Sequence, residues 1–446
     1  MHSNSFPVDG SGRGRGIGTI SRALCVHNKR GTLRRSKFIS LFYAPPETGM
    51  SQSIPQEILD LIIDYLHDEP TTLKRCCIVS KAWIPRAQKH LFVTVKFRFP
   101  WRPVSQWRVT FPDPTNSPAL HTRTLFISNL ERMTAADADT FRTFCGVVHL
   151  GVHADSMDES PITVPLHGFF PALRSLYLSS SLLRGPEFFD FICSFPLLED
   201  LILVARTYRH ENTGWNTPST SPRLTGSLDL RRTNGSCLIA NRLLDLPNGL
   251  HFTKIAISWF YESEVLSTVS LISRCSDTLE SLDITNRLHG TLPSARAQFM
   301  AGSLTLHLDS SGTPSIDLSK ATKLKDITFR CGDLNVGRIT TALQTIEPNT
   351  IEQVTIMLIH GFFSQETNRA WRNLDSLLVQ FWTSHSPRLR VVSEIARESK
   401  GEKGRDKAAR LLPELTKRVN VDLRLSAELR GPTFPSSTTA SMLEWA

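Results

Sequence analysis

The sequence predicts an α/β protein in which a short module of three helices precedes a long array of alternating strands and helices. Two observations carry this prediction. An apolar-x-x-apolar-x-apolar pattern recurs from Leu173 to Ile356, and most of its starts are 25 to 27 residues apart. Before it, residues 53–92 place apolar side chains at the three-and-four spacing of amphipathic helices. The 446-residue chain is 40% hydrophobic and 21% charged, which is the composition of a folded protein, and it contains no apolar run of about 18 residues.

Residues 1–50 hold most of the positive charge. The chain has a net charge of +9, and this segment contributes +6 of it through eight Lys and Arg residues against Asp9 and Glu47. The remaining +3 gives little support to nucleic-acid binding. Rich in Gly, Ser and Arg, the segment is predicted to be a basic disordered arm. Three alternatives stay open: a mitochondrial transit peptide, an RNA-binding patch at residues 12–16, and translation that begins at Met50, so that the arm is not part of the protein.

Residues 51–95 are predicted to form the helical module. Ser53 and Gln56 fit a capping box at the start of the first helix, with Pro55 tolerated in its first turn. Asp60 and Asp64 occupy one side of this helix. The other side is apolar and carries Ile58, Leu61, Ile62, Tyr65 and Leu66.

Two shorter helices complete the module. The break at residues 67–70 precedes a second helix that Thr71 or Thr72 is expected to cap. A third helix is expected from Pro85 to His90, with Trp83 at the corner. About 40 residues are near the lower limit for burying a core, so part of the apolar surface is expected to belong to an interface.

Ten residues of the module follow the spacing of a known pattern: Ile54, Pro55, Glu57, Ile58, Leu59, Ile62, Leu66, Leu73, Val79 and Trp83. In order and spacing they resemble the F-box, although Ile54 stands where Leu is commoner. The resemblance implies that these residues dock on the Skp adaptor of an SCF-type ubiquitin ligase, which also contains a cullin, while the rest of the chain selects the substrate. The alternative is an amphipathic segment that packs only on its own domain.

Residues 96–120 are predicted to be a linker or loop. Residues 93–99 alternate like a short strand, and residues 100–118 are rich in Pro. Trp101 and Trp107 are expected to pack under this loop, because Trp is mostly buried in proteins, and binding aromatics are the alternative.

Residues 121–430 are predicted to form the repeat domain. Helical segments at Glu187–Cys193, Glu264–Arg274 and 337–346 lie between the strand-like patterns, so stacked units would pair their strands into a parallel sheet with helices on one side. Residues 125–127 and 148–150 would begin the array, and the single 45-residue interval would hold an additional strand at residues 304–308. The pattern starts at Leu173, Leu198, Thr225, Phe252, Leu279, Leu324 and Ile351.

This repeating unit resembles the leucine-rich repeat, and the whole chain resembles F-box proteins of the fungal type with a C-terminal leucine-rich-repeat-like domain. The resemblance implies an irregular α/β solenoid. One feature departs from it, since the Asn or Cys expected eight residues after each first leucine is missing, and the usual side-chain ladder to the turn backbone cannot form. The residues at those positions are Ser181, Arg206, Thr233, Phe260, Arg287, Gly332 and Ile359.

Polar side chains alternate with the buried positions of the strands and are expected on the inner face of the sheet. Their mixed charges favour a protein partner over a phosphate backbone, and Arg231 and Arg330 are candidates to bind a phosphate on the target. The predicted target-binding residues are Tyr177, Asp229, Arg231, Lys254, Asp283, Arg330 and Gln353. Also expected to be exposed there are Ser258, Thr285, Asp326, Thr328 and Thr355.

Beyond the repeats the sequence predicts an amphipathic helix from Trp371 to Trp382 and a strand at residues 389–392. The charge run 394–410 is typical of a solvated helix or linker, and residues 419–425 alternate like a last strand that caps the sheet. Residues 431–446 are expected to be a disordered tail.

Catalytic signatures are missing from the sequence. The eight cysteines form no CxxC pair and the 14 histidines have no metal-ligand spacing, so reduced thiols, no metal and no cofactor are expected. The sequence contains no GxSxG, P-loop, HExxH or GxGxxG motif. The function expected from these features and the F-box resemblance is a non-catalytic substrate adaptor, cytoplasmic or nuclear, without membrane contact. A leucine-rich-repeat-like scaffold that binds protein or RNA without a ligase role, and an enzyme of unrecognised type, are the alternatives.

Overall fold

The computed structural model describes a series of segments of the chain. These are residues 54–98, 104–129, 134–154, 166–184, 187–209, 221–233, 236–259, 262–286, 316–331, 336–346, 350–358, 365–385, 388–393, 412–418 and 424–425. The predicted arm 1–50, the strand at 304–308, the charge run 394–410 and the tail 431–446 lie outside these described residues.

The helical module contains α1 (Gln56–Tyr65), α2 (Pro70–Val79), a 3-10 turn (Lys81–Trp83) and α3 (Ile84–Leu91). Two capping predictions need correction. Pro55 rather than Ser53 precedes the first helix, and it makes no side-chain cap. Glu69 rather than a threonine is the N-cap residue of α2, which begins at Pro70, a residue suited to the first helical position. Thr72 Oγ1 donates to Glu69 Oε2 at 2.8 Å.

The described strands form one parallel sheet in which every strand pairs with its neighbours in sequence, from β1 to β12. Such an order is compatible with an α/β solenoid, in which each repeat contacts only the adjacent repeats. The strands are β1 (Thr94–Arg98), β2 (Thr124–Ser128), β3 (His149–Ala154), β4 (Ser175–Arg184), β5 (Asp200–Arg209), β6 (Ser227–Leu230), β7 (Lys254–Trp259), β8 (Ser281–Asn286), β9 (Asp326–Cys331), β10 (Gln353–Leu358), β11 (Arg388–Ser393) and β12 (Arg424–Leu425).

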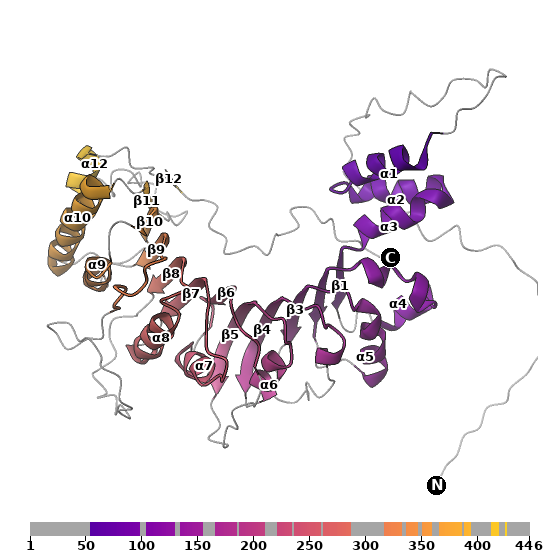
Figure 1. Cartoon of the computed structure of the whole chain (residues 1–446), viewed down its shortest axis with the longest axis horizontal. Coiled ribbons are helices and arrows are strands. Elements are labelled where there is room, and N and C mark those ends of the chain that lie inside the picture. Colours follow the sequence, from indigo (N-terminus) through magenta and orange to yellow (C-terminus); the bar gives the residue numbers. More distant parts are fainter. Residues whose placement is uncertain are drawn as a thin grey trace, which may run out of the picture.

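The sheet curves into an arc, with its strands on the inner side and α4 to α9 on the outer side (Figure 1). The helical module stands at one end of the arc, and α10 and α12 stand at the other. Among the described residues, no helix is long and apolar enough to cross a membrane. The helices after α3 are α4 (Val104–Thr110), α5 (Ala135–Phe141), α6 (Glu187–Cys193), α7 (Ser236–Leu244), α8 (Glu262–Arg274), α9 (Val336–Gln344), α10 (Gln365–His385) and α12 (Pro413–Arg418).

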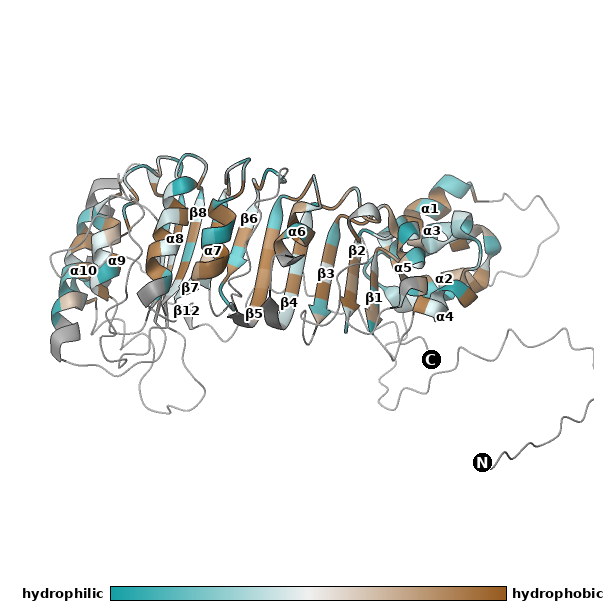
Figure 2. Cartoon of the chain, turned by 90° about the horizontal axis from the view of Figure 1, so that it is seen from below, coloured by the Kyte–Doolittle hydropathy of each residue, from teal (hydrophilic) through white to brown (hydrophobic). Residues whose placement is uncertain are grey.

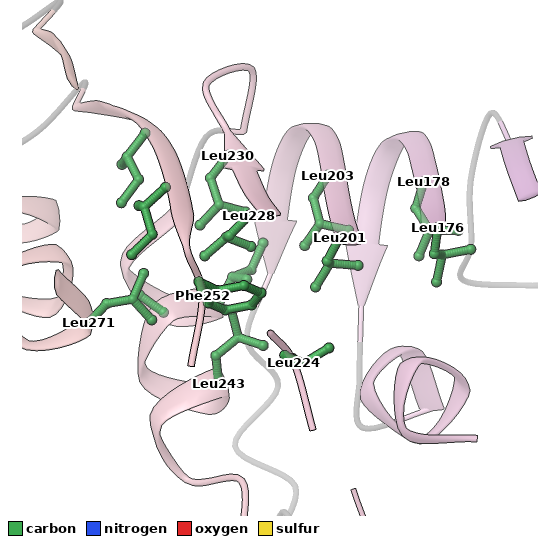
Figure 3. Close-up of a cluster of buried hydrophobic side chains, with 14 of the residues drawn as sticks. Leu176, Leu178, Leu201, Leu203, Leu224, Leu228, Leu230, Leu243, Phe252 and Leu271 are labelled. Carbon is green, nitrogen blue, oxygen red and sulfur yellow. The ribbon is translucent and has the colours of Figure 1, made fainter. Parts of the chain in front are cut away.

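The core lies between the sheet and the outer helices. Viewed from the helix side, hydrophobic stretches run along the strands behind α6, α7 and α8 (Figure 2). In Figure 3 the leucine pairs of successive repeats stand in parallel rows, because equivalent positions of neighbouring strands are in register. Leu201, for example, pairs in register with Leu176 and with Leu228, and all three are at most 1% exposed. Each such side chain contributes about 1.5–3 kcal/mol through burial.

A ladder of main-chain hydrogen bonds joins the repeats just before each strand. The N–H of Glu280 donates to the carbonyl of Thr253 at 2.8 Å, and the N–H of Lys325 donates to the carbonyl of Glu280 at 2.9 Å. Equivalent bonds run back to Val93 and forward to Glu352. The buried Thr233, at one of the positions where Asn or Cys was expected, donates its hydroxyl to the carbonyl of Leu203 at 2.8 Å. The repeats are therefore held in register without the missing asparagines.

The structure corrects two predictions about the limits of the sheet. The range 96–120, predicted to be a linker or loop, contains the end of β1, helix α4 and two 3-10 helices, so the sheet begins at Thr94 rather than near residue 121. The 45-residue interval was expected to add a strand, but β8 pairs directly with β9 through Ser281 and Asp326. The interval therefore inserts no strand between them.

Candidate functional site

The first candidate site is an exposed apolar face on the helical module. Eleven large apolar residues of the described chain are exposed, and seven of them lie between residues 54 and 79. Five belong to α1 and its approach, and we call them the module patch: Ile54, Ile58, Leu61, Ile62 and Tyr65. The other two, Ile78 and Val79, end α2. This concentration of apolar surface on so small a unit is typical of a protein–protein interface.

Beneath this surface the module has a small core of its own. Its buried members are Ile63, Leu73, Cys76 and Ala87, with Leu66 and Trp83 packed against them. The predicted adaptor-binding residues therefore divide into two groups. Leu73 is buried and Leu59, Leu66 and Trp83 are half-buried, whereas six are exposed: Ile54, Pro55, Glu57, Ile58, Ile62 and Val79. The sequence interpretation missed Ile63, which lies next to Ile62 in the chain but points to the opposite side of α1, into the core.

An ion-pair network fixes α1 against α3. Arg86 donates from Nε to Asp64 Oδ1 at 2.6 Å and also binds Oδ2, and His90 Nε2 lies 2.7 Å from Asp64 Oδ1. The hydrogen bonds from Arg86, and next those from His90, hold the pKa of Asp64 well below its usual range. The network orients the helix that presents the module patch.

Aromatic side chains join the module to the sheet. Phe92, directly after α3, packs edge-on against Trp107 with ring centroids 5.6 Å apart. Trp107 is buried, contacts Phe97 of β1, and donates from Nε1 to Ser117 Oγ at 3.3 Å. The expectation that Trp107 packs rather than binds is confirmed, and Trp101 lies outside the described residues. The module is thus attached to the start of the sheet through a packed contact.

The second candidate site is the inner face of the sheet. One line of residues, which we call the central row, crosses it in register from β1 to β10: Lys96, Phe126, Gly151, Tyr177, Ile202, Asp229, Ala256, Asp283, Thr328 and Thr355. These residues alternate with the buried leucine positions and so face away from the outer helices. The first half of the row is aromatic or apolar after Lys96, and the second half is polar except for Ala256.

Four of the seven predicted target-binding residues come together in this face. Arg231 Nη2 lies 2.5 Å from Asp229 Oδ2, and its Nη1 lies 2.9 Å from Asp283 Oδ2. Arg330 Nη2 lies 2.9 Å from the same Asp283 oxygen. We call these four residues the ion-pair cluster. Their side chains are 14 to 19% exposed, so the pairs are screened less than surface pairs.

Small residues on β7 allow the ion-pair cluster to form. Arg231 follows β6 and Asp283 lies on β8, so the guanidinium crosses β7, where the central row has Ala256. The next inner-face position of β7 is Ser258, whose hydroxyl donates to the carbonyl of Arg231 at 2.6 Å. A large side chain at either position would occupy the space that the arginine crosses.

Other predicted inner-face residues do not join the cluster. Lys254 and Asp326 are exposed, whereas Tyr177, Thr328 and Gln353 are half-buried. Gln353 Nε2 donates to Thr355 Oγ1 at 3.2 Å. Three residues expected to be exposed are instead buried, namely Ser258, Thr285 and Thr355. They are small side chains, so neighbouring groups cover them more readily than they cover the longer residues of the same face.

The pairing also bears on phosphate recognition. Both candidate arginines already donate to carboxylates, so a phosphate on a target would compete with Asp229 and Asp283 for Arg231 and Arg330. Neither guanidinium is free, and the net charge of the ion-pair cluster is zero. The geometry favours a role for these residues in shaping the inner face.

The described residues include no group of three or more His, Cys, Asp or Glu that could hold a metal ion. Burial raises the pKa of the Cys193 and Cys275 thiols to about 11, so both are protonated at neutral pH. Compared with known proteins, the chain matches no family model and no curated protein. The function is therefore argued from the two surfaces.

Proposed function

We propose that this protein is a substrate-recognition adaptor of an SCF-type ubiquitin ligase. In this proposal the helical module is an F-box that docks on the Skp adaptor, and the leucine-rich-repeat-like sheet domain binds a protein target. The observation that carries the proposal is the module patch, since a unit with four buried core residues leaves five large apolar ones exposed on its first helix and just before it. An unpartnered apolar face of this kind needs a protein partner.

The arrangement of the two surfaces supports such a role. The module stands at one end of the arc and the inner face of the sheet extends away from it (Figure 1). A partner on the module patch therefore leaves the inner face open to a second protein. Holding a ligase and its target on one chain raises their effective concentration, so ubiquitin transfer needs no bond chemistry from this chain.

Co-purification with the Skp adaptor tests the proposal. The full chain should retain the adaptor, and the double variant Pro55→Ala and Ile58→Ala should lose it, because both residues are exposed at the start of α1. Val109→Ala is the matched control, since Val109 is an 82% exposed apolar residue of α4, outside the module. Retention of the adaptor by the double variant would refute the docking face, and no retention by the unmodified chain would refute the adaptor role.

Trp83→Ala is a second variant with a different mechanism. Trp83 packs against the small core of the module, so its truncation removes support from all three helices. Adaptor binding should fall together with the protection of residues 54–91 from hydrogen exchange. Loss of binding with unchanged protection would place Trp83 in the interface instead.

A further inference from the structure

The inner face of strands β1 to β4 differs in charge from the rest of the sheet. These four strands contain no Asp or Glu. Their inner face carries Lys96 and Arg98 on β1 and His149 and His153 on β3, all of them exposed. From β5 onward carboxylates appear on this face, beginning with Asp200 and continuing with the ion-pair cluster and Asp326. Among the described residues of these four strands, the inner face therefore presents only positive side-chain charge.

An aromatic ring occupies the middle of this region. Phe126 on β2 leans across β3, because a Cβ atom placed on Gly151 would come within 2.6 Å of the ring carbon Cε1. Any larger residue at this position would have to displace the ring. Lys96 Nζ lies 5.3 Å from the centroid of the same ring, a cation–π distance.

The apolar surface continues along the central row. Tyr177 on β4 pairs in register with Gly151, and Ile202 on β5 pairs in register with Tyr177. Phe126, Tyr177 and Ile202 are all half-buried, so each keeps part of its surface in solvent. We call Phe126, Gly151, Tyr177 and Ile202 the aromatic shelf. With strands about 4.8 Å apart, the shelf spans four strands and suits one large side chain and its neighbours.

We propose that the aromatic shelf binds an acidic linear segment of the target protein. A large apolar side chain of that segment lies on Phe126, Tyr177 and Ile202, and its flanking Asp or Glu residues pair with Lys96 and Arg98. The identity of this partner as a ubiquitylation target rests on the proposed function, whereas its chemistry rests on the charge and apolar surface of the shelf. Carboxylates would gain a pairing with Lys96 and Arg98 that the strands of this region do not offer them.

A single-stranded nucleic acid is the other ligand class that combines stacking with negative charge. Proteins that bind it track the phosphate chain along a uniformly positive groove with successive stacking platforms. Here the positive region ends at β5, where Asp200 accepts hydrogen bonds from the Ser227 N–H and hydroxyl at 2.7 Å. A phosphate chain that continued along the arc would meet this carboxylate and those of the ion-pair cluster. A short acidic peptide whose carboxylates pair with Lys96 and Arg98 on β1 keeps its charge at the opposite end of the shelf from Asp200 on β5.

Fluorescence anisotropy with the full chain tests the inference. The probe is a labelled, end-blocked nonapeptide with a central tryptophan flanked by glutamates. It should bind at least about tenfold more tightly than the same peptide with lysines for glutamates or alanine for tryptophan. Affinity should fall as salt rises, because the charge pairs are exposed. A ten-nucleotide oligouridylate that competes for the same site would overturn the peptide assignment.

Variants of the chain locate the site. Phe126→Ala, and separately Lys96→Glu with Arg98→Glu, should each weaken the acidic peptide at least about tenfold. The matched controls are Leu197→Ala, which truncates an exposed apolar residue outside the shelf, and Lys323→Glu, which reverses an exposed charge in the turn before β9. Phe126→Leu should restore part of the binding, since leucine keeps apolar surface over Gly151.

Failure of this inference is distinguishable from failure of the adaptor role. The shelf variants should still retain the Skp adaptor, because the module patch lies on α1. Undetectable binding of the acidic peptide, or binding that Phe126→Ala and the charge reversals leave unchanged, would overturn the shelf assignment whatever the adaptor result.

Discussion

The helical module and the sheet domain differ in how much of their apolar surface is buried. The module buries four residues in its core and leaves the module patch in solvent. In the sheet domain one continuous core runs from Phe92 to Leu415, and only four exposed large apolar residues lie in its described part. The sheet domain is therefore stabilised by contacts among its own repeats, whereas the exposed apolar surface of the module is of the kind that a protein partner covers.

The largest expected effect is the loss of a core side chain from the sheet domain. Leu201→Ala removes a fully buried leucine between Leu176 and Leu228 and should lower the free energy of unfolding by about 2–5 kcal/mol. Chemical denaturation of the full chain measures it. The exposed Leu197→Ala, four residues earlier, should change it by less than about 0.5 kcal/mol. Equal losses of unfolding free energy for the two variants would contradict the assignment of Leu201 to the core and of Leu197 to the surface.

A charge on the module patch should act on binding rather than on stability. Ile62 is 48% exposed, so Ile62→Asp should leave the free energy of unfolding within about 0.5 kcal/mol of its original value. Affinity for the Skp adaptor should fall about 30-fold or more, which corresponds to about 2 kcal/mol. Isothermal titration calorimetry measures the affinity. A large loss of stability without a loss of affinity would mean that this face packs on the chain itself.

Within the sheet domain, the two arginines of the ion-pair cluster should differ in how much each one stabilises the fold. Arg231 pairs with Asp229 and Asp283, whereas Arg330 pairs with Asp283 alone. Arg231→Met leaves Asp229 uncompensated and should cost about 2 kcal/mol, and Arg330→Met should cost about 1 kcal/mol because Arg231 still pairs with Asp283. Denaturation curves of both variants give the difference. A larger loss of stability for Arg330→Met than for Arg231→Met would show that Arg330 stabilises the cluster more than Arg231 does.

The smallest expected effect is a difference in acid sensitivity. Hydrogen bonds from Arg86, and then from His90, lower the pKa of Asp64 in the folded module, so the folded state binds this proton more weakly than the unfolded state does. The stabilisation is complete above the unfolded pKa of about 3.9 and declines as the pH falls below it. The protection factors for hydrogen exchange in residues 54–91 should fall as the pH decreases. The Asp64→Asn variant should lack this acid-dependent fall in protection.

In the sheet domain the pKa of Asp375 is shifted in the opposite direction, upward. Burial raises its pKa in spite of the hydrogen bonds it accepts from the N–H groups of Glu414 and Leu415. Its protonated form is therefore favoured by folding, so this contribution is greatest below the unfolded pKa and declines as the pH rises. The protection factors of the α12 amides, which compare measured with intrinsic exchange rates, should fall between acidic and neutral pH, opposite to the trend expected for α1. The same trend in both helices would contradict the assignment.

Much of the repeat architecture could be predicted from the sequence. The alternating pattern located β4 to β10, and the weak matches at residues 125–127 and 148–150 correspond to β2 and β3. Helix α6 has the predicted bounds, and α10 contains the predicted helix from Trp371 to Trp382. These features are local, because side-chain periodicity is set within one strand or helix. Helices α4, α5, α7 and α12 were missed, since with six to nine residues each they are too short to show a distinctive period.

The local pattern of residues predicts that short strands recur at a fixed interval, that a three-helix module precedes them, and which side of each strand is apolar. The tertiary fold sets which polar residues meet. Arg231 reaches Asp283, 52 residues away, because β6, β7 and β8 pair in a register that brings Ala256 between them. It also decided that Ile63 enters the module core while Ile62 stays in solvent. Such outcomes depend on strand register and helix packing, which join residues distant in the chain and leave no mark in the local pattern.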